Sequence, residues 1–175
     1  MTSQTVPPFA ELLKACERSA VHLETRDVYA IPGEGEEFRA WRAGEDPRRV
    51  PRGAWWNAFH DAVADAVSRG VAVRRARVVS APLSEYIRYE HACTYQNVEA
   101  GEDVRWLPRS NASDLLLPGN DLWIFDDRLI RFAWFSGDGE LVGQSLVDDL
   151  DVVKRHAEAF RAVWERAVPH ADYTP

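Results

Sequence analysis

The chain has very little lysine: of its 21 basic residues, only Lys14 and Lys154 are lysines, and the rest are arginines. Acidic residues number 28, so the formal net charge is −7. A nucleic-acid-binding surface needs a local excess of lysine and arginine. This balance argues against direct contact with DNA or RNA. Arginine-rich usage is typical of GC-rich genomes, and arginine also suits bidentate pairing with a carboxylate or a phosphate.

Cysteine and long apolar runs are also scarce. The two cysteines, Cys16 and Cys93, are too far apart in the sequence to form a C-x-x-C pair. They predict reduced core thiols, which are typical of a reducing compartment. No basic and apolar leader opens the sequence, and no apolar run approaches the ~18 residues of a membrane span. We therefore expect a cytoplasmic protein without membrane association.

The familiar catalytic motifs do not occur. The sequence has no G-x-G-x-x-G or Walker loop and no G-x-S-x-G elbow. Its five histidines do not pair at helical or zinc-finger spacing. The carboxylate clusters at 34–37, 126–127 and 148–151 fall at expected helix starts and turns, where negative charge is favourable. The sequence therefore predicts no catalytic residue, no metal ion and no cofactor.

The composition is that of a single globular domain, with 175 residues of which 46% are apolar and 28% charged. We place the domain at residues 9–168, between a loose leader at 1–8 and a tail at 169–175. Periodicity predicts helices at 9–20, 34–43, 55–69, 83–98 and from 149 or 151 to 168, and strands at 21–27, 71–80, 104–107, 121–125, 129–135 and 140–146. This order favours an α+β fold: a central mixed β-sheet with a C-terminal antiparallel meander and flanking helices.

The most informative pattern lies in residues 71–98. In the helix that starts near residue 83, Glu90 falls on the apolar side, where an ionised carboxylate is costly unless it is paired. The preceding strand offers partners, because Arg75 and Arg77 share a face with valines. We predict that Glu90 pairs with Arg77 or, failing that, with Arg75. This pair either is purely structural or forms part of an anion- or partner-binding pocket with nearby aromatic and arginine residues.

A second candidate lies in the alternating strand at 21–27, where His22, Glu24 and Arg26 share one face that we expect to be solvated. An imidazole, an acid and a base on one surface can serve proton transfer. A solvated sheet face with cross-strand ion pairs is the simpler interpretation. The candidate ligand-binding residues of the whole chain are Glu24, Arg26, Arg77, Tyr86, Arg88, Glu90, Arg105 and Trp106.

Several segments together resemble an actinobacterial family of unknown function, over about residues 9–168. They are residues 22–29, 78–86, 100–109, 122–127 and 146–149. Members of this family are often encoded beside helix-turn-helix regulators of the WhiJ type. The resemblance implies no particular activity. Through the gene neighbourhood it implies a regulatory role with a helix-turn-helix regulator as protein partner.

The order of strand, helix, strand and meander from Val71 also resembles one half of a phospholipase-D-like domain. The catalytic signature of that superfamily, His-x-Lys followed by Asp, is absent, because Glu24 and Cys93 stand two residues after His22 and His91. The resemblance therefore implies a non-catalytic version of the fold, and fold alone does not carry function.

From these patterns we expect a non-enzymatic regulatory or accessory module that binds a small anionic ligand or a partner protein. The alternative is a small acid–base enzyme of secondary metabolism, with a pocket at Glu24, Arg26 and Glu90. A closed pocket with strongly shifted titration of these groups would favour the enzyme.

Overall fold

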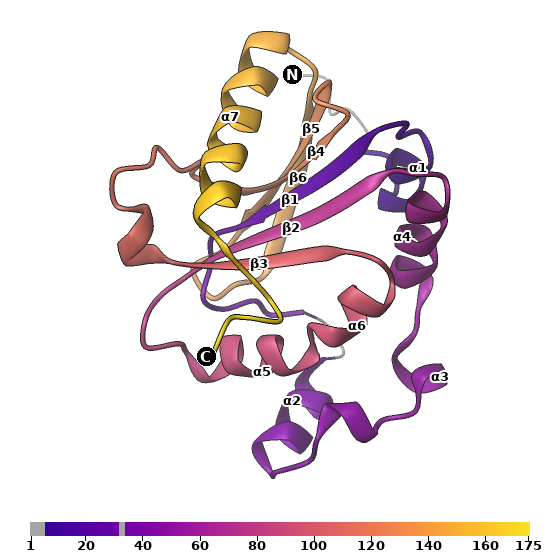
Figure 1. The fold of residues 1–175 in the computed structure, drawn as a ribbon, viewed down its shortest axis with the longest axis vertical. Helices are drawn as coiled ribbons and strands as arrows, with labels where there is room; N and C mark the ends of the chain where they lie inside the picture. The colour runs from indigo at the N-terminus through magenta and orange to yellow at the C-terminus, as the bar shows by residue number, and fades with distance from the viewer. Residues whose placement is uncertain (1–5, 32–33) are drawn as a thin grey trace.

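A seven-stranded mixed β-sheet forms the centre of the molecule (Figure 1). The computed structural model describes residues 6–31 and 34–175. In this part of the chain the strand order is β6-β5-β4-β1-β2-β3-β7. β1, β2 and β3 are parallel, and β4, β5 and β6 form an antiparallel meander beside β1. The strands are β1 (Ser19–Glu24), β2 (Ala72–Val79), β3 (Asp103–Pro108), β4 (Asp121–Phe125), β5 (Leu129–Phe135), β6 (Leu141–Val147) and β7 (Val168–Pro169). The predicted α+β fold is confirmed.

Helices cover both faces of this sheet. The crossovers from β1 to β2 and from β2 to β3 run over the same face, as right-handed connections require when strands are added in one direction. They carry α2 (Glu34–Arg42), the short helix η1 (Pro47–Arg49), α3 (Arg52–Trp55), α4 (Ala58–Ser68), α5 (Glu85–Cys93) and α6 (Tyr95–Glu99). α1 (Phe9–Lys14) packs beside α4, whereas α7 (Leu150–Arg166) covers the opposite face (Figure 1). A short helix, η2 (Arg109–Ala112), follows β3.

The two faces of the sheet are packed differently. Under α7 the apolar core is continuous and includes Leu23 of β1 and Phe160 of α7. On the other face the core consists of two clusters, one beneath α1 and α4 and one beneath α5. β2 contributes Val73 to the first cluster and Val79 to the second, and residues 75 and 77 between them are arginines. A strip of charge therefore separates the two apolar clusters.

The predicted first helix, at 9–20, is too long, because α1 ends at Lys14 and β1 already starts at Ser19. The Asp126 carboxylate accepts hydrogen bonds from the backbone N–H groups of Glu17, Arg18 and Ser19, at 2.8–3.0 Å. These bonds compete with helical ones and draw the chain into the sheet. Local periodicity does not reveal an acceptor that lies more than a hundred residues further along the chain.

The predicted helix at 83–98 is two helices, α5 and α6, that meet at Thr94. The Thr94 hydroxyl donates to the backbone oxygen of Glu90 at 2.7 Å. The first of the two helices has its N-cap at Ser84, one residue later than the predicted start. The last helix, predicted to start at 149 or 151, has its N-cap at Asp149, whose side chain accepts from two backbone N–H groups of α7.

The two ends of the predicted domain also differ from a simple leader and tail. Of the predicted leader at 1–8, residues 1–5 lie outside the described residues, as does the Pro32-Gly33 pair before α2. The predicted tail at 169–175 packs against the sheet: β7 pairs with β3, and the Tyr173 ring stacks on Trp106 with centroids 5.6 Å apart. Residues 44–53, between the predicted helices at 34–43 and 55–69, contain η1 and the start of α3. No helix in the described part of the chain has both the length and the apolar character that a bilayer crossing requires.

The turn between β5 and β6 leads to a first prediction. Gly139 has a φ of +87°, and a Cβ there would lie 2.9 Å from the backbone oxygen of Val28. Gly139 also accepts a hydrogen bond from the backbone N–H of Ala30. We expect Gly139→Ala to lower the free energy of unfolding by about 1–3 kcal/mol, measured by urea denaturation. Gly137→Ala, where nothing lies within 4 Å of the added Cβ, serves as the control and should change it by less than about 0.5 kcal/mol. Equal unfolding midpoints for the two variants would contradict this account.

Candidate functional site

Three charged side chains from two parallel strands form the floor of the candidate site. In the register of β1 and β2, His22 lies opposite Arg75 and Glu24 lies opposite Arg77. All four side chains point to the face covered by α4 and α5, because alternate residues of a strand share a face. Glu24, Arg75 and Arg77 are buried, with exposed fractions of 8%, 7% and 4%. Ions at this depth must be neutralised by one another.

The charges do pair, in one continuous network. Arg75 hydrogen-bonds Glu24, and its Nε lies 2.9 Å from Oε1 of Glu102. Arg77 lies between two carboxylates: its Nε is 2.9 Å from Oε2 of Glu24, and its Nη1 is 2.5 Å from Oε2 of Glu90. The predicted ion pair between Glu90 and Arg77 is therefore confirmed. Arg75, the predicted second choice for Glu90, pairs with Glu24 and Glu102 instead.

Burial and pairing act in opposite directions on the pKa of Glu24. Burial alone would raise it, but Arg75 and Arg77 outweigh burial and hold the pKa of Glu24 at about 2. The same burial lowers the pKa of His22 well below its usual range, so the imidazole is neutral at pH 7. The His22 ring stacks on Trp123, with centroids 4.3 Å apart and an angle of 15° between the planes. His22 is thus held flat beside the ions as an uncharged group.

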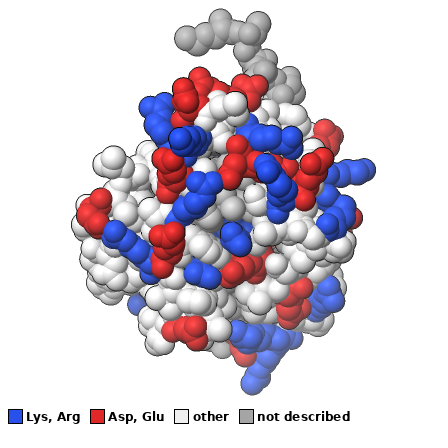
Figure 2. Space-filling view, turned by 45° about the horizontal axis from the view of Figure 1, so that its top comes forward, with Lys and Arg blue, Asp and Glu red and all other residues white. Residues whose placement is uncertain are grey.

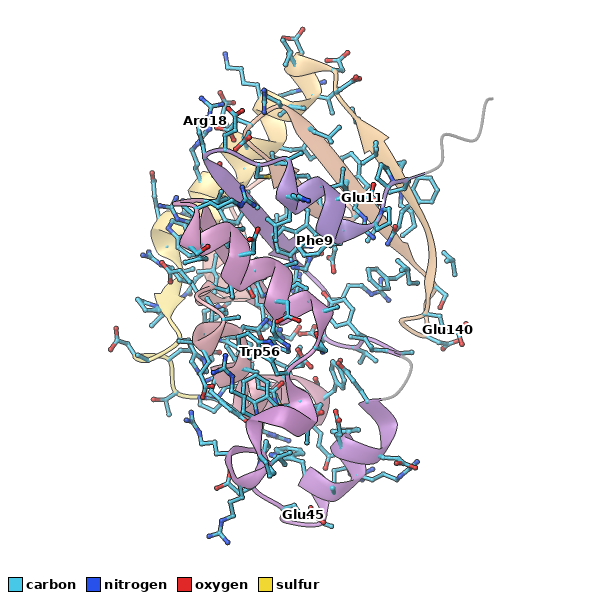
Figure 3. All side chains as sticks on the ribbon, turned by 90° about the vertical axis from the view of Figure 1, so that its right-hand side faces the viewer. Phe9, Glu11, Arg18, Glu45, Trp56 and Glu140 are labelled. Atoms are coloured by element: carbon cyan, nitrogen blue, oxygen red, sulfur yellow. The ribbon has the colours of Figure 1, made fainter. Side chains whose placement is uncertain are left out.

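A cavity of about 1170 Å³ lies above this network. Its floor is formed by β1, β2, β4 and β5, and its walls by the segments of α2, α3, α5 and α6 that face the sheet. Trp56 and Glu140 line it from the two sides visible in Figure 3. A smaller hollow of about 380 Å³, lined by Phe9, Phe59 and Trp123 among others, shares His22 and Arg131 with it. A charged floor with aromatic walls is a typical arrangement for a small-molecule site.

Two further carboxylates beside the cavity are hydrogen-bonded by tyrosines. Tyr86 of α5 donates to Glu34 of α2 at 2.8 Å and also lies 3.3 Å from Glu90. The Tyr29 hydroxyl donates to Asp121 at 2.5 Å, and the backbone N–H of Thr25 donates to the same carboxylate at 2.9 Å. Burial, reinforced by the Glu90 charge, raises the pKa of Glu34 to about 7, and burial also raises the pKa of Asp121. Neither carboxylate forms an ion pair with a cation in the described part of the chain.

The other residues predicted for the site do not all gather there. Arg26 lies beyond the end of β1 and donates to the backbone oxygen of Ser136, with its guanidinium over the Phe135 ring. Arg88 is exposed on α5. Arg105 lies on the opposite face of the sheet and packs over Trp164 of α7. Trp106 is fully buried beneath Arg77, where its ring can act as a platform but does not line the cavity.

The predicted solvated face of β1 is wrong. His22 and Glu24 are covered by the crossover segments, with side-chain exposures of 15% and 10%. Alternation of polar and apolar residues identifies two faces of a strand, but here both faces are buried and the polar one carries an ion network. The sequence does not show that the polar face is covered as well.

A family model described as "Domain of unknown function (DUF6879)" matches residues 7–175. The chain belongs to the DUF6879 family. The predicted resemblance to a family of unknown function is thereby confirmed at that level. No curated protein matches the sequence. One solved structure, described as "Structure of TrmBL2, an archaeal chromatin protein, shows a novel mode of DNA binding", is 16% identical, with a TM-score of 0.49. The match covers 91% of this chain and 48% of that one, so the DUF6879 chain spans about half the length of the archaeal protein.

Four residues of the DUF6879 site escaped the sequence analysis: Tyr29, Glu34, Glu102 and Asp121. Glu102 follows Gly101 in the turn before β3, and its cationic partner, Arg75, lies 27 residues earlier in the chain. Asp121 starts β4, a position where aspartate is usually a turn residue. One signal was available in the sequence. Two arginines were predicted on the covered face but only one glutamate was predicted to pair with them, and two buried arginines need more than one carboxylate. Within the described residues, no group of three or more His, Cys, Asp and Glu side chains is arranged to hold a metal ion.

The network predicts a pH-dependent loss of stability in Glu24→Gln. Because the folded-state pKa of Glu24 is about 2 and its ordinary value is 4.5, its stabilisation is complete above pH ~4.5 and is lost as the pH falls towards 2. We expect the variant to lower the free energy of unfolding by about 3 kcal/mol at pH 7 and by clearly less at pH 3. Chemical denaturation at both pH values measures this difference.

Glu99→Gln is the matched control, because Glu99 is exposed at the end of α6. It should change the free energy of unfolding by less than about 0.5 kcal/mol at either pH. A loss in Glu24→Gln that is equally large at pH 3 and pH 7 would mean that the carboxylate charge is not what stabilises the network.

Proposed function

We propose that this DUF6879 domain is a non-enzymatic regulatory module that binds a small organic ligand in the cavity and acts on a partner protein. The observation that carries the proposal is the floor of the cavity, where Glu24, Arg75 and Arg77 form ion pairs beneath a hollow of about 1170 Å³. Groups paired in this way offer a fixed polar surface to a ligand. With a pKa of about 2, Glu24 is ionised near neutral pH: it cannot act as a general acid, and its pKa is far from the operating pH that suits a general base.

The sign of the ligand's charge follows from the same contacts. The sequence-based expectation of an anionic ligand relied on arginines that are free to bind it. Arg75 and Arg77 each contact two carboxylates, so their positive charge is already compensated and attracts a further anion only weakly. The ion pairs therefore favour a ligand that is not anionic.

The proposed partner is a helix-turn-helix regulator of the WhiJ type, as the sequence resemblance implies, in the cytoplasm of an actinobacterial cell. In this proposal the domain does not contact nucleic acid itself. Its formal net charge is −7, and the face shown in Figure 2 carries acidic and basic side chains interspersed, unlike the continuous basic footprint of a nucleic-acid-binding surface. The relation to a non-catalytic phospholipase-D-like domain stays a prediction.

One observation favours the enzymatic alternative. Of the three residues predicted for an acid–base pocket, Glu24 and Glu90 line the cavity and Arg26 does not. Glu34, with a pKa of about 7 at the same cavity, is the better candidate for a general acid or base. If the domain is an enzyme, Glu34→Gln abolishes turnover of its substrate, whereas a binding module has no turnover to lose.

Native mass spectrometry of the protein purified from its own host tests the ligand. We expect the wild type to retain a small molecule and Ala133→Phe to lose it, because Ala133 lines both hollows and the larger side chain would project into the space beside Asp121, its partner across β4 and β5. Ala171→Phe, an exposed position outside the cavity, is the control and should retain the adduct. Circular dichroism confirms that each variant is folded. An adduct that persists in Ala133→Phe would contradict binding in the cavity.

The partner is tested in the same preparation. We expect a helix-turn-helix regulator to co-purify with the wild type, and its affinity for operator DNA to change at least several-fold when the domain is added. A regulator whose DNA binding is the same with and without the domain would contradict the regulatory part of the proposal.

A further inference from the structure

The groups that line the cavity carry an excess of negative charge. Six lining residues are carboxylates: Glu24, Glu34, Glu37, Glu90, Asp121 and Glu140. Three lining residues are guanidinium groups, and two of these, Arg75 and Arg77, are already paired in the network. Because Glu102 also pairs with Arg75, three carboxylates of the network share two cations. The network alone therefore leaves about one negative charge uncompensated at the floor of the cavity.

Glu34 and Asp121 add to this excess. Each accepts a hydrogen bond from a tyrosine hydroxyl, which solvates a carboxylate but does not neutralise it. The rings of Tyr29 and Tyr86 lie 6.3 Å apart between centroids, so the two carboxylate–tyrosine pairs are neighbours. Burial raises the pKa of both acids, as expected where negative charges lack a counter-ion. A cation at this place would relieve both carboxylates.

Aromatic rings form much of the remaining wall. Tyr29, Trp55, Trp56, Phe59, Tyr89 and Phe135 line the cavity. The faces of such rings attract cations and also pack against apolar groups. The third guanidinium group, Arg131, is hydrogen-bonded to Gln144 at 2.7 Å and belongs to the part shared with the smaller apolar hollow. A molecule with one charged and one apolar end can therefore point its charge towards α2 and α5, away from Arg131.

We infer that the cavity binds an organic cation, namely a protonated amine on an apolar or aromatic body, with the ammonium group beside Glu34, Glu90 and Asp121. The inference rests on the proposed function, since it names the class of ligand for that cavity. The ammonium donates hydrogen bonds to Glu34 and Asp121, which form no ion pair in the described part of the chain, and to Glu90, which shares Arg77 with Glu24. The apolar body lies against the aromatic wall and displaces water from it.

Matched compounds separate charge from shape. The test uses 3-phenylpropylamine, 3-phenylpropanol and 3-phenylpropionate, with the naphthyl analogue of each, titrated into the purified full chain by isothermal titration calorimetry at pH 8. Both amines should bind about tenfold or more tightly than the alcohol on the same skeleton, because hydrogen bonds to charged groups are the stronger ones. The carboxylates should bind weakest.

Variants then locate the charge. Glu34→Gln should reduce the advantage of the amine over the alcohol several-fold and leave the affinity for the alcohol unchanged. Glu36→Gln is the matched control, because Glu36 lies on the same helix, is exposed and does not line this cavity. Lowering the pH from 8 to 5.5 should have the same effect on the wild type as Glu34→Gln, since Glu34 becomes protonated among Glu37 on α2, Tyr86 and Glu90 on α5, and Arg77 on β2.

The outcomes distinguish the two proposals. A carboxylate or an alcohol that binds at least as tightly as its amine would overturn the inference and leave the cavity as a ligand site. Amine binding that is equal in the wild type and Glu34→Gln would place the ammonium elsewhere and also overturn it. If none of the six compounds binds, the inference fails, whereas the proposed function is decided separately by whether the wild type retains a small molecule that Ala133→Phe loses.

Discussion

Two arginines on one face of a central strand are the constraint on which the rest of the structure depends. Arg75 and Arg77 lie inside the molecule and need carboxylates, and each carboxylate comes from a different element: Glu24 from β1, Glu90 from α5 and Glu102 from the turn before β3. The network thus fixes the β2–β3 crossover to the sheet at two points. A buried ion network adds little net stability compared with apolar packing, but here it specifies where each of these elements must lie.

The same constraint explains why the molecule is hollow on this side. Guanidinium and carboxylate groups cannot be covered closely by apolar side chains without losing solvation that pairing does not fully replace. The apolar core of this face therefore consists of two clusters on either side of the ions, whereas the core under α7 is continuous. Between the two clusters the crossover segments arch over the sheet, and the cavity lies beneath them.

The sequence predicted the parts of this arrangement that depend on local pattern. Strand alternation showed that Arg75 and Arg77 share a face, helical periodicity turned Glu90 towards them, and β4 and β5 have the predicted bounds. The sequence-based prediction failed where contacts between segments far apart in the chain determine the structure. Asp126 ends α1 from across the chain, and β7 exists because β3 offers it an edge. Glu102, Tyr29 and Asp121 meet the site only through tertiary packing, and Arg105 was misplaced because an odd-numbered position on β3 faces α7.

Within the site, α2 is the helix that contributes Glu34, the carboxylate whose pKa is raised to about 7. None of its residues is buried, so it holds to the rest of the molecule through a few contacts with α5. These include the rings of Phe38 and Trp41 against Tyr89, the ion pair of Arg42 with Glu85, and the hydrogen bond from Tyr86 to Glu34. An element with so little buried surface is of low local stability. A ligand that contacts both Glu34 and Glu90 would add a bridge between α2 and α5 and so strengthen the attachment of α2. Because α2 is exposed, a partner protein could contact this helix directly. In the proposed function, binding in the cavity would therefore reach the outer surface through α2 alone, and the β-sheet would not need to rearrange.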